Sequence, residues 1–202
     1  MVRKRQHIEN KRRIPRQSRA EETVSAILEG AAQILETSGL AAFTTNAVAE
    51  RAGVSIGTLY QYFADKQAIL RAIAERELKA TLAKVARAMS EGSEASPEAR
   101  ARAIVRAMVG AFHGRQRARK AVVQAVFSEG GGAALQAPIA AFIAAHALDA
   151  LREQQTFVLS RALLGAIRAA VLEEKSFLRD AAFEDELVRL VTAYLRAVLP
   201  AA

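Results

Sequence analysis

The sequence predicts an all-α fold, and three observations lead to that prediction. Apolar residues recur at spacings of three and four, as in Val24, Ile27, Leu28 and Ala31, which places them on one face of a helix. No segment shows the apolar and polar alternation that is typical of a half-buried strand. The hydrophobic content of 51% over 202 residues is enough for a sizeable core. We therefore expect about nine helices.

Glycines and capping side chains indicate where these helices begin and end. Threonine, serine and aspartate side chains accept hydrogen bonds from the first free N–H groups of a helix, and glycine tolerates the positive φ that often ends one. We expect helices to begin after Thr44, Ser55, Asp65 and Ser96, and to end at Gly39, Gly53 and Gly92. Further helices are expected over 104–112, 122–127, 135–153, 157–174 and 183–199.

The net charge of +8 is concentrated at the N-terminus. Residues 1–19 hold eight lysines and arginines and one acid, Glu9, so the rest of the chain is nearly neutral. Such a basic arm favours a polyanionic partner, although a solvated tail is an equally good interpretation of the arm alone. Pro15 interrupts it and no apolar stripe runs through it, so we expect residues 1–18 to be disordered.

The segment TTNAVAERAGVSIGTLYQYFADKQAIL, residues 44–70, predicts two short helices joined by a tight turn at Gly53. On a helical wheel for the second helix, Leu59 and Phe63 share one face. Polar and aromatic side chains occupy the opposite face, where a buried helix would carry apolar ones. This arrangement is typical of the helix-turn-helix motif, which lays its second helix in the major groove of DNA. The alternative is an ordinary helical hairpin with exposed tyrosines.

The same segment resembles the DNA-binding signature of the tetracycline-repressor (TetR) family of bacterial regulators. The matching positions are Thr44, Val48, Ala49, Ala52, Gly53, Val54, Ser55, Gly57, Leu59, Tyr60, Phe63, Lys66 and Leu70. The resemblance implies an N-terminal three-helix DNA-binding domain and a C-terminal six-helix domain for ligand binding and dimerisation. We therefore expect a basic arm over 1–18, a helix-turn-helix domain over 19–65, and an effector-binding and dimerisation domain over 66–202. Outside residues 19–70 the resemblance is one of architecture only.

The resemblance also implies which side chains meet DNA. The residues expected to face the duplex are Thr45, Asn46, Ser55, Gly57, Thr58, Tyr60, Gln61 and Tyr62, with Lys66 meeting a phosphate. A lysine in the first turn of a helix is unfavourable for the helix dipole, so a phosphate partner would account for it. Base readout is expected to depend chiefly on Gln61, Thr58 and Asn46.

In this family the last two helices form a four-helix bundle with a second subunit, and a palindromic operator requires a two-fold dimer. The resemblance thus implies a dimer interface that includes Leu164, Ile167, Val171, Leu187, Leu190, Val191, Tyr194 and Val198. Bulky or polar residues of the middle helices are candidates for the wall of an effector pocket, although a residue of this kind is more often part of the core. The candidates are Met89, Met108, Phe112, His113, Phe127, Phe142, His146 and Phe157.

Two other classes of function compete with this interpretation. An enzyme is disfavoured, because the chain has no cysteine and its three histidines (His7, His113 and His146) have neither metal-ligand spacing nor a catalytic grouping. We therefore expect no catalytic residues, metal or cofactor. A general nucleic-acid-coating protein would use only the basic arm and bind without regard to sequence.

The sequence thus predicts a homodimeric, DNA-binding transcriptional regulator. We expect a repressor that leaves a palindromic operator when it binds a small apolar or aromatic effector. With neither a signal peptide nor a run of about 18 apolar residues, we expect it to be soluble and cytoplasmic, with no membrane partner.

Overall fold

The computed structural model describes residues 10–91, 96–112, 114–128 and 151–199. Within these residues the regular structure consists of eight α-helices and two short 3-10 helices, which confirms the all-α prediction. The chain divides into two compact units, Met1–Ala72 and Ile73–Ala202. Helix α4 (Lys66–Glu91) begins in the first unit and ends in the second. The boundary thus lies one to two turns inside α4, seven residues beyond the predicted division at 65.

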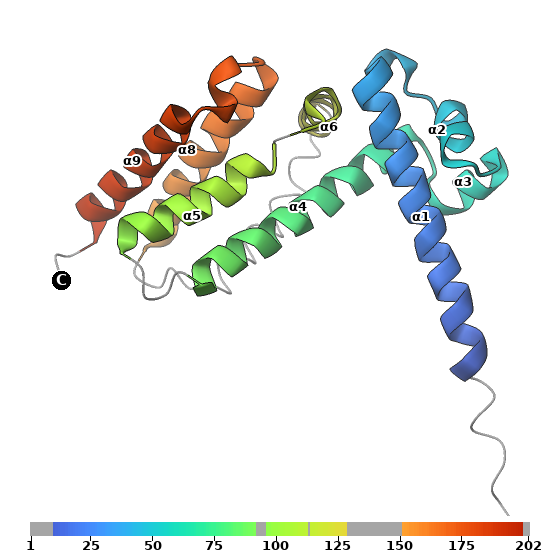
Figure 1. The fold of residues 1–202 in the computed structure, drawn as a ribbon, viewed down its shortest axis with the longest axis horizontal. Coiled ribbons are helices and arrows are strands. Elements are labelled where there is room, and N and C mark those ends of the chain that lie inside the picture. The colour runs from blue at the N-terminus through green and yellow to red at the C-terminus, as the bar shows by residue number, and fades with distance from the viewer. Residues whose placement is uncertain (1–9, 92–95, 113, 129–150, 200–202) are drawn as a thin grey trace, which may run out of the picture. The chain divides into compact units, whose positions relative to one another are not determined.

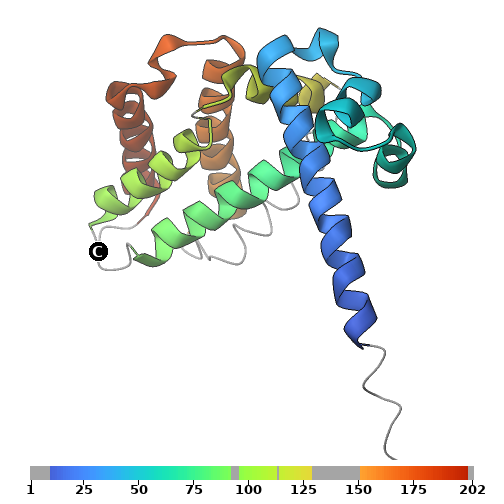
Figure 2. The same ribbon diagram turned by 45° about the vertical axis from the view of Figure 1, so that its right-hand side comes forward.

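The first unit consists of α1 (Asn10–Ser38), η1 (Leu40–Ala42), α2 (Thr45–Ala52), α3 (Ile56–Tyr62) and the start of α4. Helices α2 and α3 lie beside the C-terminal half of α1 (Figures 1 and 2). The four α-helices contribute apolar side chains to the interior, including the fully buried Ile27, Leu35, Val48, Leu59 and Leu70, and Phe43, which follows η1, is buried with them. The burial of these side chains holds the two short helices, because helices of seven or eight residues are unstable on their own.

Helix α1 begins earlier than the sequence predicted. It runs through Pro15 from Asn10, so residues 10–18, which we expected to be disordered, are helical. Proline lacks the N–H that would bond to the carbonyl four residues back, and it disfavours a helix interior. The lysines, arginines and glutamine around it are good helix formers, which extend the helix outward from its packed half. Residues 1–9 of the predicted arm lie outside the described residues.

The second unit contains α5 (Pro97–Gly110), α6 (Gln116–Ser128), α8 (Glu153–Leu172), η2 (Ser176–Arg179) and α9 (Ala181–Val198). Helices α5, α8 and α9 pack side by side (Figures 1 and 2). Their shared core contains Val105 and Val109 from α5, Ile167 from α8, and Leu187 and Val188 from α9. Ser96 caps α5 with Pro97 in the first turn, as the sequence predicted.

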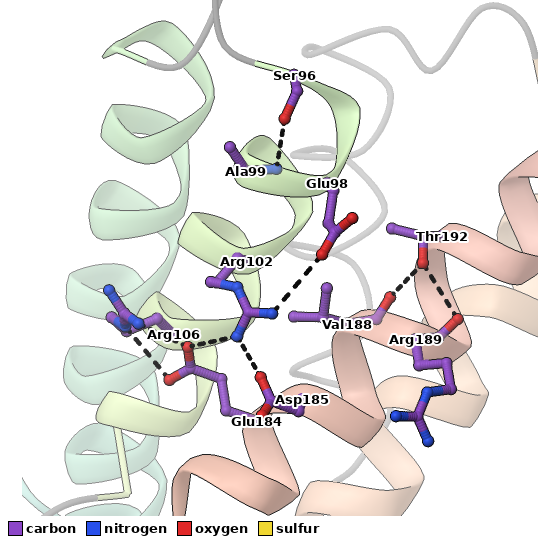
Figure 3. Close-up of polar contacts among 10 residues, drawn as sticks. All are labelled: Ser96, Glu98, Ala99, Arg102, Arg106, Glu184, Asp185, Val188, Arg189 and Thr192. Carbon is purple, nitrogen blue, oxygen red and sulfur yellow. Dashed lines mark hydrogen bonds and ion pairs between the residues drawn. The ribbon is translucent and has the colours of Figure 1, made fainter.

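Ion pairs join α5 to α9 along the edge of this core (Figure 3). Arg106 contacts the carboxylate of Glu184 with two nitrogens, at 2.8 and 3.3 Å. Arg102 forms a hydrogen-bonded ion pair with Asp185 and also lies near Glu184. The hydrogen bond to Asp185 is the main cause of a raised pKa at the Arg102 guanidinium. Because Arg106 and Asp185 are exposed and the other two groups are only partly buried, solvent screens these pairs, and they align the two helices more than they stabilise them.

Helix α8 is the most apolar of the described helices. By length and composition alone this helix could cross a membrane, because its most apolar 18-residue window has a mean hydropathy of 1.3. A helix of this kind was not predicted from the sequence. Alanines and leucines produce this value, and a helix at the centre of a bundle has the same composition. Leu163, Ile167, Ala170 and Val171 are buried against the neighbouring helices, so the packing in this unit accounts for one part of the apolar surface, while Phe157 and Val158 are exposed.

Candidate DNA interface

The turn between α2 and α3 is fixed by the residues that the sequence singled out. The Thr44 hydroxyl accepts the Ala47 N–H at 3.2 Å and so caps α2. Gly53 ends α2 with φ 69°, in the left-handed region that glycine adopts without strain. The Ser55 hydroxyl then accepts the Thr58 N–H at 3.0 Å and caps α3. These predicted caps are confirmed, and they set the angle at which α3 leaves α2.

Helix α3 buries one face and exposes the other. Leu59 is fully buried, and Phe63, the residue after the helix, is nearly so. On the free face Tyr60 is 52% exposed and Tyr62 is 38% exposed, and Gln61 is exposed as well. The predicted outward orientation of the tyrosines is therefore confirmed. The exposed surface of α3 carries hydrogen-bonding groups and aromatic rings, together with one aliphatic side chain, Ile56, which is 38% exposed.

Two side-chain contacts order this exposed face. The Tyr60 hydroxyl lies 3.1 Å from the Thr45 hydroxyl, so a hydrogen bond links α3 to the first turn of α2. The hydroxyls of Ser55 and Thr58 lie 2.8 Å apart within α3. Four of the predicted DNA-facing residues thus restrain each other's rotamers. Pre-ordered side chains lose less entropy when a ligand is bound.

Gly57 leaves a gap in the same face. A Cβ atom built there would meet only the Ser55 hydroxyl oxygen, at 3.8 Å, so no contact among the described residues requires a glycine at position 57. Asn46 is exposed near the start of α2, and Lys66 is exposed in the first turn of α4. The Asp65 side chain caps α4 by accepting the Ala68 N–H at 2.6 Å, as the sequence predicted. The nine predicted DNA-facing residues therefore all come from α2, α3, the turn between them and the start of α4.

The predicted effector-pocket residues are placed less uniformly. Met108 and Phe112 pack against the core of the second unit, and Met89 is half-buried on α4. Phe157, in contrast, is 60% exposed and stacks against the guanidinium of Arg161, so the structure does not place it in a cavity wall. His113, Phe142 and His146, and the side chain of Phe127, lie outside the described residues.

The predicted dimer residues separate into two groups. Ile167, Val171 and Leu187 are buried within the second unit itself, because they fall on the inward stripes of α8 and α9. This finding removes them from the candidate interface. Leu190 is 40% exposed, and the half-buried members of the set are Leu164, Val191, Tyr194 and Val198. An apolar stripe in sequence does not distinguish the chain's own core from a partner surface.

The sequence analysis missed the role of Gly30. This glycine lies in α1 where that helix crosses α2, and a Cβ there would approach the Ala52 backbone nitrogen to 3.1 Å. The close packing of the two helices therefore depends on it. A glycine inside an otherwise apolar helical stripe is the signal that predicts such an approach.

Comparisons with known proteins agree with this geometry. Residues 27–73 match the family model described as bacterial regulatory proteins, tetR family. A search of curated proteins gives no match. Solved structures with the same fold include a TetR-family transcriptional regulator from Streptomyces coelicolor, at 20% identity and a TM-score of 0.60, covering 88% of this chain and 99% of that one.

Two further structures contain bound compounds. The multidrug binding protein EbrR complexed with ethidium is 20% identical, with a TM-score of 0.61 and coverage of 84% of this chain and 98% of its own. The regulator LfrR from Mycobacterium smegmatis, in complex with proflavine, is 19% identical, with a TM-score of 0.55 and coverage of 90% and 99%. At these identities the likeness shows the fold.

Residues 27–73 therefore match the DNA-binding region of the tetR family of bacterial regulatory proteins. The chain as a whole shares its fold with TetR-family transcriptional regulators.

Proposed function

We propose that the protein is a ligand-responsive repressor that binds a palindromic operator as a homodimer. The exposed face of α3 is the observation that carries this proposal. Its polar and aromatic side chains have no role in the core, and its orientation is fixed by two caps and the Tyr60 to Thr45 hydrogen bond. A helix held in this way suits insertion into the major groove.

Within the interface the residues take different parts. Gln61 presents an amide that suits a bidentate contact to adenine, and Thr58 and Asn46 offer further hydrogen bonds to base edges. Tyr60, Tyr62, Thr45, Ser55 and Lys66 reach phosphate oxygens and so fix the register of α3 without reading sequence. Gly57 lets the α3 backbone come close to the duplex.

The exposed faces of α8 and α9 support the dimer. Leu190 on α9, and Phe157 and Val158 on α8, are large apolar side chains left at the surface. Gly165 lies further along α8, and a Cβ added there would meet nothing within 4 Å. A partner helix therefore has room for a close approach at this position. A two-fold dimer carries two copies of α3, which is what the two half-sites of a palindromic operator require.

The effector is proposed to be a small apolar or aromatic molecule that binds in the second unit. EbrR and LfrR, whose structures contain ethidium and proflavine, support an aromatic compound by analogy of fold. Such a ligand releases DNA only if it prefers a conformation in which the two α3 helices no longer match the operator.

The test of the DNA-binding proposal begins with selection of bound duplexes from a random pool by the full chain. Fluorescence anisotropy then compares the wild type, Gln61→Ala and the matched control Gln124→Ala, an exposed glutamine of α6. We expect Gln61→Ala to lose discrimination at one operator position, at a cost of about 1 to 3 kcal/mol there. The control should bind as the wild type does.

Equal losses on the selected and the random duplex for Gln61→Ala would contradict base readout by this residue. The competing proposal, a sequence-indifferent nucleic-acid-binding protein, makes a different prediction. It requires that the selection returns no preferred sequence and that substitutions in α3 leave binding unchanged.

A further inference from the structure

A cavity of about 540 Å³ opens in the second unit where α6, the end of α8 and η2 meet. Phe112, Ala170, Val171 and Leu178 form its apolar part. The volume is in the range of sites that hold a small organic molecule. Of the predicted effector-pocket residues that the structure describes with their side chains, which are Met89, Met108, Phe112 and Phe157, Phe112 alone lines this cavity.

The rest of the cavity wall is strongly basic. It contains the cations Arg117, Arg119, Lys120, Lys175 and Arg179, and one acid, Glu174. The five positive charges and one negative charge leave a net charge of +4 around a small volume. Charges of one sign around a concave, partly apolar site concentrate the field and attract the opposite charge.

Ion pairs neutralise only part of this charge. Arg119 contacts Glu77 at 3.1 Å, Lys120 pairs with Glu174, and Lys175 contacts Glu173 at 3.1 Å. The hydrogen bond from Lys120, followed by its charge, lowers the pKa of Glu174, which therefore stays ionised.

Two arginines in the wall have no ion pair within the part of the chain that the structure describes. Arg117 acts on Glu174 only through its charge, and Arg179 has neither a carboxylate within 4 Å nor a hydrogen bond to its side chain. Both are exposed. Two unpaired guanidiniums in the wall of a partly apolar cavity are suited to hydrogen-bonded contact with a carboxylate.

The backbone around the cavity is consistent with a binding role. Among the described residues, the only non-glycine residues with positive φ are Glu174, at 53°, and Arg115, at 31°, and both flank this cavity. A glycine is usual at such positions, so a charged residue there costs stability. The carbonyls of Val171 and Ala170 at the end of α8 accept the N–H groups of Glu174 and Lys175. The negative end of the α8 dipole disfavours an anion, so the cations of the wall have to outweigh it.

We infer that this cavity binds a small amphipathic organic anion, with its carboxylate held by Arg117 and Arg179 and its apolar body against Phe112, Val171 and Leu178. The inference goes beyond the proposed regulation of DNA binding. A chain that bound no operator would still bind the anion here, so the test uses the full chain without DNA.

Isothermal titration with octanoate is the direct experiment, with 1-octanol as the uncharged analogue and inorganic phosphate as the anion without an apolar body. We expect saturable binding of octanoate, and at least tenfold weaker binding of the two other probes. In Arg117→Gln/Arg179→Gln the octanoate affinity should fall at least tenfold. The matched control Arg76→Gln removes an exposed arginine of α4 that does not line the cavity, and it should bind normally.

A variant with the opposite effect separates recognition from misfolding. Glu174→Gln removes the one acid of the wall and releases Lys120, so octanoate should bind more tightly, by about threefold or more. A double arginine variant with unchanged affinity, a wild type that binds octanol as well as octanoate, or a wild type that binds neither would overturn the inference. Phosphate binding equal to that of octanoate would overturn the apolar part of the assignment.

Discussion

Glycine 57 provides a test in which stability and DNA binding should change in opposite directions. The change Gly57→Ala adds one methyl group to the second residue of α3, where the nearest atom is 3.8 Å away. Alanine is favoured over glycine in a helix by roughly 0.5 to 1 kcal/mol. In a chain of this length that gain corresponds to a rise in Tm of about 1 to 4 °C.

The same methyl group projects from the surface that is proposed to approach DNA. If the α3 backbone lies against the duplex, the methyl group separates the two surfaces and lengthens the hydrogen bonds of Thr58 and Gln61. We expect affinity for the selected operator to fall at least tenfold, which is about 1.4 kcal/mol. Thermal melting followed by circular dichroism and anisotropy titrations on one preparation measure both effects.

Gly30→Ala is the matched control, because it makes the same chemical change in α1. There the added Cβ lies 3.1 Å from the Ala52 backbone nitrogen and 3.2 Å from the Arg51 side chain. Overpacking of this kind costs about 1 to 3 kcal/mol, which exceeds the gain in helix propensity. We therefore expect a lower Tm. A Gly57→Ala variant that binds the operator as tightly as the wild type would refute the proposed approach of the backbone.

Three further predictions concern the partners. The variant Lys66→Ala should weaken binding to all duplexes alike and reduce the slope of log affinity against log salt concentration by about 0.9. Anisotropy titrations at several salt concentrations measure this slope, and an unchanged slope would exclude a phosphate contact. Deletion of residues 2–17 should lower the affinity for DNA and its dependence on salt, but leave the preferred sequence and the dimer unchanged. A deletion variant that binds DNA as tightly as the full chain would show that the arm does not contribute to binding. The double variant Leu190→Glu/Tyr194→Glu should give a helical monomer that loses operator binding, because a dimer would bury the unpaired charges twice. Circular dichroism measures the helicity and sedimentation the mass, and a variant that stays a folded dimer would place the interface elsewhere.

The sequence was sufficient for the local structure of the DNA interface. Thr44, Gly53, Ser55 and Asp65 act within a few residues of themselves, through caps and a left-handed turn. Each of these interactions joins residues that are a few positions apart in the sequence, so the spacing of residue types is enough to predict it. The outward orientation of Tyr60 followed from the same helical period.

The second unit was less predictable, because its features depend on contacts between distant segments. Ile167 and Leu187 lie on apolar stripes that suit a core or a partner equally well, and only the packing assigns them to the core. The basic cavity unites residues 112–120 with residues 170–179. The first segment is visibly basic, with four lysines and arginines and no acid, but its sequence does not show that it meets the end of α8 around a cavity. The extension of α1 through Pro15 was also not predicted, because the helix-forming residues around the proline outweigh its tendency to break a helix.

On α3 the residues that stabilise the fold are separate from those proposed to read DNA. Leu59 and the adjacent Phe63 supply its buried contacts, and Ser55 supplies its cap. Gln61 and Tyr62 are exposed, and no hydrogen bond or ion pair of their side chains is found in the part of the chain that the structure describes. A substitution of Gln61 should therefore change operator preference, and a substitution of Tyr62 should change affinity for all duplexes alike, each at little cost in folding free energy. Tyr60 is the exception, because its hydroxyl bonds to Thr45, so Tyr60→Phe should alter DNA affinity through the orientation of α3 as well as through direct contact.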